Sequence, residues 1–185
     1  MILLLAAAFG YVVGAVSPAT LVARARGVDL RAVGSGNPGA ANAGRALGRR
    51  TGALIAILDV AKGAVPAALL GAVDHRAGLV AGVAAVLGHV TSPLLRGRGG
   101  KGVATAAGAI LGSHPLWVVA VLVVWVAVLA VWRWIALASV CAALTVLVVA
   151  LLADQDVGWA AALAAIVVVR HQRNFGRRLR PRPQP

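Results

Sequence analysis

Residues 102–152 read GVATAAGAILGSHPLWVVAVLVVWVAVLAVWRWIALASVCAALTVLVVALL, and Arg133 is the only Lys, Arg, Asp or Glu among them. A membrane-spanning helix needs about 20 apolar residues, so this stretch is long enough for more than one crossing. Ser113-His114-Pro115 and Trp132-Arg133-Trp134 divide it into shorter apolar runs. We therefore expect several hydrophobic helices here that lie in lipid.

The rest of the chain repeats this alternation of apolar runs and short polar segments. Further apolar runs cover residues 2–23, 52–73, 78–95 and 157–169. The first run lacks the basic start and the clear cleavage site of a signal peptide, so we expect it to be the first membrane span. The runs at 102–112 and 157–169 are short for a full crossing. Either they extend into their polar flanks or they stop inside the membrane.

Composition favours a single helical bundle in a membrane. Hydrophobic residues make up 61% of the 185 residues and the mean hydropathy is +0.90, whereas soluble domains are about 45–50% apolar. Aromatic residues account for only 4%, while 22 glycines are present, and small residues allow helices in lipid to pack closely. The expected fold is an all-α polytopic membrane protein in which residues 1–185 form one domain. The lone Cys141 offers neither a disulfide framework nor a thiolate metal site.

The charge pattern indicates how the chain crosses the membrane. A net charge of +13 would indicate nucleic-acid binding in a soluble protein, but here the cations lie between apolar runs. With about seven crossings, all cations except Lys62 and Arg76 fall on one side. The positive-inside rule makes that side cytoplasmic, with the N-terminus outside and the C-terminus inside. Five spans plus half-inserted helices would give the same orientation.

Residues 34–42, GSGNPGAAN, form the most informative loop. Gly34, Gly36 and Gly39 match the dinucleotide pattern G-x-G-x-x-G, but that pattern requires a preceding strand and a βαβ unit. A membrane span and arginines precede it here, so we exclude that interpretation. Glycines still allow backbone N–H groups to converge on an anion. Ser35, Asn37 and Asn42 add hydrogen-bond donors and Arg45 adds a cation, so we predict anion binding, with a flexible solvated loop as the alternative.

Residues 97–102, GRGGKG, form a second glycine loop. It is not a Walker A motif, because Leu95 occupies the position of the first glycine and Gly102 that of the Ser or Thr. A lysine at the tip of a glycine loop that opens a helix can hold a phosphate. Lys101 is therefore a predicted phosphate ligand, and a positive-inside membrane anchor is the alternative.

Ionisable side chains inside or beside the apolar runs form a third group. Asp59 and Lys62 lie three residues apart on one helix face, and such groups within a span are usually paired. A structural brace and a direct role both remain open. His89 precedes the glycine-lysine loop, while His171 and Asn174 lie where the last helix meets the basic tail. No histidine and carboxylate pair has metal-ligand spacing, so we predict no metal.

Together these stretches resemble the bacterial acyl-phosphate:glycerol-3-phosphate acyltransferase family (the PlsY family). The matches follow the family's order and spacing over nearly the whole chain, and the ordered set is far more specific than any one motif. They are Gly14-Ala15-Val16-Ser17-Pro18, Gly34 to Asn42 with Arg45, Asp59-Val60-Ala61-Lys62-Gly63, Gly88-His89, Gly99-Gly100-Lys101-Gly102-Val103-Ala104-Thr105 and His171-Gln172-Arg173-Asn174.

Some positions depart from the family pattern. Ala15 and Ala41 stand where Ser and Thr are typical, and an acidic residue often found after the final arginines is absent from 181–185. The aromatic residues usual before the glycine-lysine loop are replaced by Thr91, Leu94 and Leu95. These changes leave both phosphate loops intact, and they bear on acyl-chain preference and tail contacts rather than on activity.

The resemblance implies transfer of a fatty acyl group from acyl phosphate to the 1-hydroxyl of sn-glycerol 3-phosphate, the first acylation of phospholipid synthesis. It implies an enzyme of the bacterial inner membrane with its active site on the cytoplasmic side. The partners are the two substrates and membrane lipid, with no cofactor and no nucleic acid. The expected catalytic residues are Ser35, Lys101, His171 and Asn174. The expected substrate-binding residues are Gly34, Gly36, Asn37, Gly39, Asn42, Arg45, Gly99, Gly100, Gly102 and Thr105.

The residues also suggest a mechanism. The chain has neither a nucleophile elbow nor the His-x4-Asp motif of other glycerolipid acyltransferases. Because acyl phosphate is an activated mixed anhydride, positioning and charge stabilisation can suffice, with the donor's own phosphate accepting the hydroxyl proton. Two alternatives remain at this point. A small transporter for phosphorylated solutes would use the Asp59–Lys62 pair, and a membrane scaffold would use the basic tail.

Overall fold

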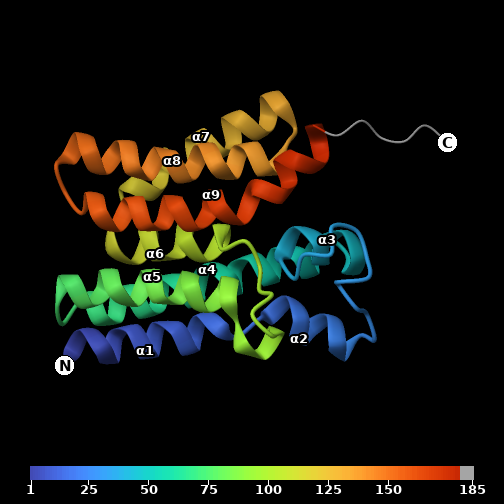
Figure 1. Cartoon of the computed structure of the whole chain (residues 1–185), viewed down its shortest axis with the longest axis horizontal. Helices are drawn as coiled ribbons and strands as arrows, with labels where there is room; N and C mark the ends of the chain where they lie inside the picture. Colours follow the sequence, from blue (N-terminus) through green and yellow to red (C-terminus); the bar gives the residue numbers. More distant parts are fainter. Residues whose placement is uncertain (180–185) are drawn as a thin grey trace. The chain divides into compact units, whose positions relative to one another are not determined.

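A computed structural model of the protein describes residues 1–179, which form helices and loops without a single strand (Figure 1). The all-α prediction is confirmed for this part of the chain. The tail arginines Arg180 and Arg182 lie outside the described residues, as do the side chains of residues 177–179. The elements are α1 (Ile2–Ala15), α2 (Pro18–Ala25), α3 (Ala40–Leu47), α4 (Arg49–Gly71), α5 (His75–Thr91), the 3₁₀ turn η1 (Pro93–Leu95), α6 (Val103–Ser113), α7 (Trp117–Trp132), α8 (Ile135–Ala153) and α9 (Val157–Leu179).

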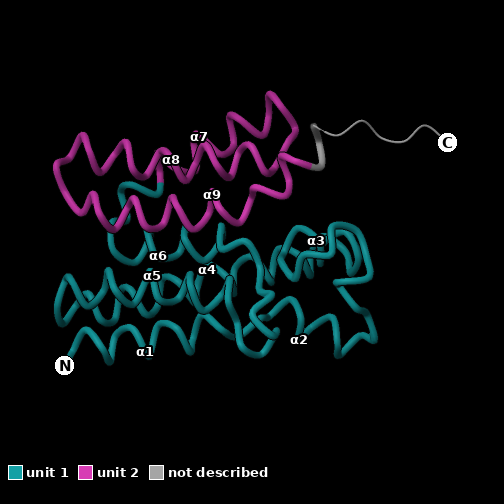
Figure 2. Tube along the Cα trace, viewed as in Figure 1, with its two compact units in different colours: residues 1–118 teal, residues 119–185 magenta. Residues whose placement is uncertain are grey.

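The chain divides into two compact units (Figure 2). The first covers Met1–Val118, and the second begins at Val119, just inside α7. The first unit contains both glycine loops, and the second contains His171 and Asn174.

Four helical segments are long and apolar enough to cross a membrane among the described residues. They are Ile2–Ala25, Arg49–Gly71, His75–Leu95 and Ile135–Ala153. α6 has 11 residues and α7 has 16, so both are shorter than a typical span. α9 has 23 residues and continues past its apolar part into the arginines, which is one of the two outcomes expected for the run at 157–169. The chain is thus an integral membrane protein, while the prediction of about seven crossings stays a prediction.

Most helix ends lie at the prolines and polar residues that interrupt the apolar runs of the sequence. The interruptions at residues 113–115 and 132–134 separate α6, α7 and α8 as expected. The first apolar run differs, because it breaks between α1 and α2. Val16 is extended (φ −67°, ψ 129°) and Ser17 accepts a hydrogen bond from the Thr20 N–H (3.3 Å) as the N-cap of α2. Pro18 explains this break, since proline favours the first helical position and an extended residue before it.

Small residues bring the helices of the first unit close together. α1 packs against α5, and α4 packs against α6 (Figure 1). A Cβ atom on Gly14 would overlap the carbonyl of Ala85, and one on Gly63 would overlap the carbonyl of Thr105. Backbones therefore meet directly at these crossings, as helix packing in lipid favours.

In the second unit, α8 packs against α9. Trp125 of α7 donates its indole N–H to the hydroxyl of Ser139 on α8 (3.5 Å). The rings of Trp134 and Phe175 lie 4.8 Å apart, which holds the start of α8 beside the last turns of α9. These contacts position the part of α9 that carries His171.

Candidate active site in the two glycine loops

The loop before α3 is shaped by one buried amide. Asn42 is 1% exposed, and its Nδ2 donates to the carbonyls of Leu30 (2.9 Å) and Val33 (3.1 Å). Its Oδ1 accepts the N–H of Ser35 (3.0 Å). Both amide hydrogens are thus used within the chain. Asn42 fixes the path of residues 30–35, and its predicted contact with substrate stays a prediction.

The glycines of this loop take the conformations that its tight path requires. Gly34 and Gly36 have φ values of +56° and +69°, which favour glycine. A Cβ on Gly34 would also collide with Oδ1 of Asn42. The N–H groups of Gly36 and Gly39 bond to the carbonyls of Val33 (3.1 Å) and Asn37 (2.9 Å).

The anion-binding capacity of this loop therefore differs from the sequence expectation. The N–H groups of Ser35, Gly36 and Gly39 bond within the loop, so they do not converge on an outside anion. The exposed side chains of Ser35 and Arg45 are the candidate anion ligands instead. The Arg45 guanidinium donates to the Ser35 hydroxyl at 3.4 Å. Asn37, two residues after Ser35 in the sequence, is half-buried. A cation next to a hydroxyl can hold a phosphate oxygen.

The second glycine loop folds back onto the end of α5. The N–H of Gly99 bonds to the carbonyl of Val90 (3.1 Å), and that of Gly100 bonds to the carbonyl of His89 (3.2 Å). A Cβ on Gly100 would overlap Nε2 of the His89 ring. Gly102 (φ +81°) then opens α6, and Lys101 is half-buried between these glycines. Glycine at these positions permits close packing, while Lys101 carries the charge.

Arg31 joins the two loops, a role that no motif in the sequence predicts. Its guanidinium donates to the carbonyls of Leu95 (3.0 Å) and Arg98 (3.3 Å). Its own N–H is held by the carboxylate of Asp29 (2.9 Å). Because Arg31 lies three residues before the first loop and Arg98 lies in the second, these bonds bring the two loops close together. No motif or spacing signals a contact that spans 64 residues of sequence.

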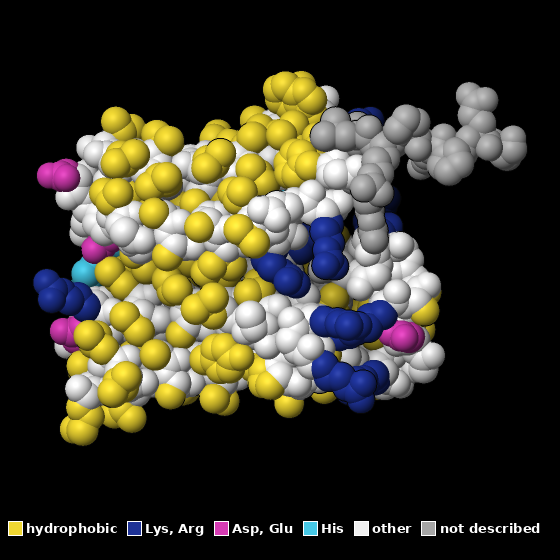
Figure 3. All heavy atoms as spheres, in the orientation of Figure 1, with side chains coloured by type: hydrophobic (Ala, Val, Ile, Leu, Met, Phe, Trp, Pro, Cys, Tyr) yellow, Lys and Arg dark blue, Asp and Glu magenta, His cyan; other side chains and the backbone are white. Residues whose placement is uncertain are grey.

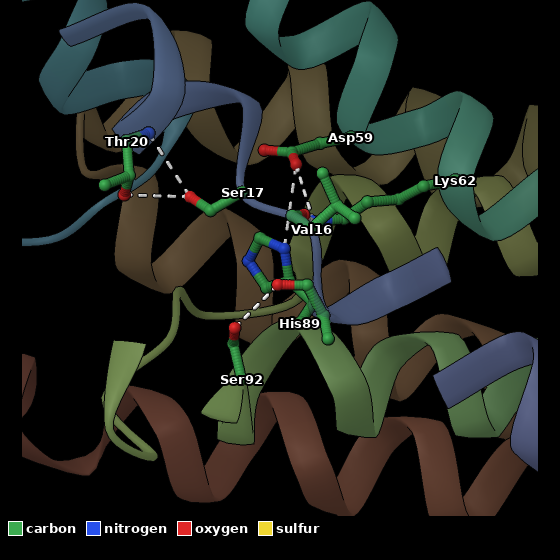
Figure 4. Close-up of polar contacts among 8 residues, drawn as sticks. Val16, Ser17, Thr20, Asp59, Lys62, His89 and Ser92 are labelled. Atoms are coloured by element: carbon green, nitrogen blue, oxygen red, sulfur yellow. Dashed lines mark hydrogen bonds and ion pairs between the residues drawn. The ribbon is translucent and has the colours of Figure 1, made fainter. Parts of the chain in front are cut away.

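Asp59, Lys62 and His89 form a buried charge cluster (Figure 4). Lys62 Nζ lies 3.0 Å from Asp59 Oδ1 and donates to the carbonyl of Val16 at 2.7 Å. His89 Nδ1 lies 3.6 Å from the same Asp59 oxygen. Ser92 donates to the carbonyl of Ala15 at 2.6 Å. The predicted pairing of Asp59 with Lys62 is confirmed.

These contacts tie α4 to the break between α1 and α2 and to the end of α5. Asp59, Lys62 and His89 are 3%, 7% and 7% exposed, and His89 packs against Gly100 of the second loop. The geometry therefore favours the structural brace over a direct role. It also removes the main sequence support for a transporter, because this ion pair is used to join helices.

Three further residues belong to the predicted site: Thr105 in the first unit, and His171 and Asn174 in the second. Thr105 is 0% exposed, and its hydroxyl has no hydrogen-bond partner among the described residues. Its carbonyl meets Gly63, so Thr105 lies in the contact between α4 and α6.

His171 and Asn174 belong to α9 of the second unit. His171 is 1% exposed, and its Nδ1 lies 2.8 Å from the carbonyl of Val167. A carbonyl can only accept, so Nδ1 carries the proton. Asn174 follows three residues later, on the same helix face.

Basic side chains gather at one end of the first unit. In Figure 3 Lys and Arg side chains cluster around α2, α3 and the loop before α6. The cations that belong to these segments include Arg24, Arg45, Arg96, Arg98 and Lys101. Both glycine loops lie in this basic region, which suits a ligand with a phosphate group.

Comparison with known proteins gives the family. The model of the family described as glycerol-3-phosphate acyltransferase matches residues 4–181. The protein from Geobacter sulfurreducens described as glycerol-3-phosphate acyltransferase is 44% identical over 183 residues, covering 96% of this chain and 93% of its own.

Two solved structures have the same fold as this chain. They are crystal structures of PlsY (YgiH), described as an integral membrane glycerol 3-phosphate acyltransferase, in the glycerol 3-phosphate form and in the lysophosphatidic acid form. The first has a TM-score of 0.90 at 34% identity and covers 96% of this chain and 92% of its own. The second has a TM-score of 0.88 at 33% identity, with 96% and 91% covered.

Proposed function

The chain belongs to the glycerol-3-phosphate acyltransferase family, and from this premise we propose that it acylates the 1-hydroxyl of sn-glycerol 3-phosphate with acyl phosphate as donor. The products are lysophosphatidic acid and inorganic phosphate. One observation carries the proposal for this chain. Arg31 holds together two glycine loops that present Ser35, Arg45 and Lys101 in one basic region. Both proposed substrates carry phosphate groups that these side chains can bind.

In the proposed reaction the 1-hydroxyl oxygen attacks the acyl carbonyl carbon. The bond between that carbon and the phosphate oxygen breaks, and phosphate leaves. The leaving phosphate takes the hydroxyl proton, so no protein base is required. The residues act by positioning the substrates and by stabilising negative charge on the carbonyl oxygen and the phosphate.

We assign the residues to the two substrates as follows. The loop from Ser35 to Asn42, through the exposed Ser35 side chain, and Lys101 hold the phosphate and the carbonyl oxygen of the donor. Arg45, Lys101, His171 and Asn174 bind glycerol 3-phosphate. The structure supports the first group through the joined loops of the first unit. The role of His171 is supported by the hydrogen bond between its Nδ1 and the carbonyl of Val167, which fixes the orientation of the ring on α9.

The proposal also places the protein in the cell. About seven crossings put the basic loops on the cytoplasmic side of the bacterial inner membrane, with the N-terminus outside. The whole chain acts as one acyltransferase domain without cofactor or metal. The support is the separation of charge along the sequence, since cations other than Lys62 and Arg76 fall on one side.

A donor comparison tests the reaction. Purified protein in lipid is given labelled glycerol 3-phosphate with acyl phosphate, acyl-CoA or an acyl carrier protein thioester in separate reactions. Lysophosphatidic acid formed from acyl phosphate alone is the expected result. Product from a thioester and none from acyl phosphate would refute the proposed donor. No product from any donor would refute acyl transfer altogether and make solute flux the next assay.

A further inference from the structure

A pocket adjoins the proposed active site in the first unit. It has a volume of about 510 Å³ and is lined by α2, the segment that follows it, Pro38 and the turn η1. Ligand pockets in proteins are typically about 300–1,000 Å³. Pro38 of the first glycine loop and Arg31 also line it, but Arg45 and Lys101, the cations assigned to the substrates in this unit, do not. Its remaining cations therefore have no role in the proposed reaction.

The pocket combines positive charge with an apolar wall. Arg24, Arg31 and Arg96 line it together with one carboxylate, Asp29, which leaves an excess of two positive charges (three minus one). Arg31 is held by main-chain carbonyls. The side chains of Arg24 and Arg96 make no hydrogen bond or ion pair within the described part of the chain. Half of the lining residues are apolar, including Leu30, Leu94 and Leu95.

Its position suits a molecule that is partly in lipid. Arg24 lies in the last turn of α2, at the end of the candidate span Ile2–Ala25. Leu21 on that helix is 58% exposed and Leu94 of the pocket wall is 66% exposed. Exposed apolar side chains are therefore present both on the candidate span and on the pocket wall, which also carries the cations. Basic pockets beside membrane helices are where anionic lipid headgroups bind.

We propose that this pocket binds the phosphate headgroup of an anionic membrane lipid. Arg24 and Arg96 pair with the phosphate, and the start of the acyl chains lies against Leu94 and Leu95. A free phosphate ion shares the headgroup's charge but would leave the apolar wall uncovered. Lipid binding here requires no acyl transfer, so it can be measured without substrates and its failure is distinct from failure of the proposed reaction.

The test is lipid retention by the full-length protein. Phosphatidylglycerol, with zwitterionic phosphatidylcholine for comparison, is titrated onto purified protein in detergent and counted by native mass spectrometry. The double variant R24Q/R96Q removes the two unpaired cations and leaves Arg31 in place. The charge-matched control is R49Q/R50Q, at the exposed start of α4. Affinity for phosphatidylglycerol should fall about tenfold or more in R24Q/R96Q and stay unchanged in the control.

Each other outcome overturns the proposal in its own way. Equal loss in both double variants would show diffuse attraction to a basic surface. Unchanged binding in R24Q/R96Q, or equal retention of both lipids, would refute the pocket as a binding site for anionic lipid. Displacement of phosphatidylglycerol by inorganic phosphate at matching concentration would make this a site for free phosphate. If R24Q/R96Q elutes as aggregate, R24Q alone should still weaken binding about threefold, and no change would refute the site.

Discussion

Replacement of Lys62 by methionine tests whether the buried cluster of Asp59, Lys62 and His89 stabilises the helices that carry it. The change keeps most of the side-chain volume but removes the ammonium that lies 3.0 Å from Asp59 and 2.7 Å from the Val16 carbonyl. Asp59 is 3% exposed, so its charge loses its main partner in a buried site. Breaking a buried ion pair from one side costs about 3–5 kcal/mol, which is a large part of the roughly 5–15 kcal/mol that stabilises a domain.

The double variant Asp59→Asn with Lys62→Met separates the lost charge pair from the lost hydrogen bonds. It leaves no unpaired charge, so we expect it to be more stable than Lys62→Met alone, with the residual loss of about 1–3 kcal/mol that unsatisfied buried groups cause. The assay is thermal unfolding in detergent followed by circular dichroism. For a chain of this size, 3–5 kcal/mol corresponds to a fall in Tm of roughly 6–20 °C.

Arg76→Met is the matched control for this experiment, since it removes an exposed cation at the start of α5. Exposed substitutions usually change stability by less than about 0.5 kcal/mol. If Lys62→Met lowered Tm no more than Arg76→Met, the buried cluster would not hold these helices together. A double variant less stable than Lys62→Met would equally contradict the reasoning.

Three further predictions concern the loops and α9. Arg31→Gln should lower kcat/KM about tenfold, because the two loops lose the guanidinium that joins them. Tm should fall by only a few degrees, because one of the two lost hydrogen bonds is partly buried and the other is exposed. Arg50→Gln should change neither quantity. Gly100→Ala should lower the free energy of unfolding by about 1–3 kcal/mol, because the new Cβ overlaps the His89 ring. The control is Gly158→Ala, whose Cβ would meet no atom within 4 Å. In thermal unfolding it should be neutral or slightly stabilising. His171→Gln should mainly raise KM for glycerol 3-phosphate in steady-state kinetics, and loss of kcat instead would show that a protein base is used.

The sequence predicts the helical architecture well because its main determinants are local. Pro115 and Arg133 interrupt apolar runs, and helices end at both places. The pairing of Asp59 with Lys62 also follows from local spacing, since residues three apart share a helix face. The break at Val16 interrupts the run expected to form one continuous span, and Pro18 is a recognisable local signal for it.

The candidate site depends on contacts that no local pattern encodes. The partners of Arg31 are main-chain carbonyls, which every residue possesses, so the sequence does not identify them. For the same reason Asn42 could be predicted as a polar group but not as the residue that fixes the loop. Phosphate binding by Gly100 stays a prediction, and its position against the His89 ring adds a packing requirement that becomes visible only in three dimensions.

The most direct test of a phosphate site in the joined glycine loops compares Lys101→Ala with Arg98→Ala. Both variants remove one cation from the same loop, but Arg98 contributes only its main-chain carbonyl to the contact with Arg31. The measurement is the initial rate of lysophosphatidic acid formation from acyl phosphate, with protein of equal thermal stability. We predict at least a hundredfold loss for Lys101→Ala, about the magnitude for removal of a charge-stabilising group, and little change for Arg98→Ala. Equal rates in the two variants would contradict the assignment of Lys101 and the site built around it.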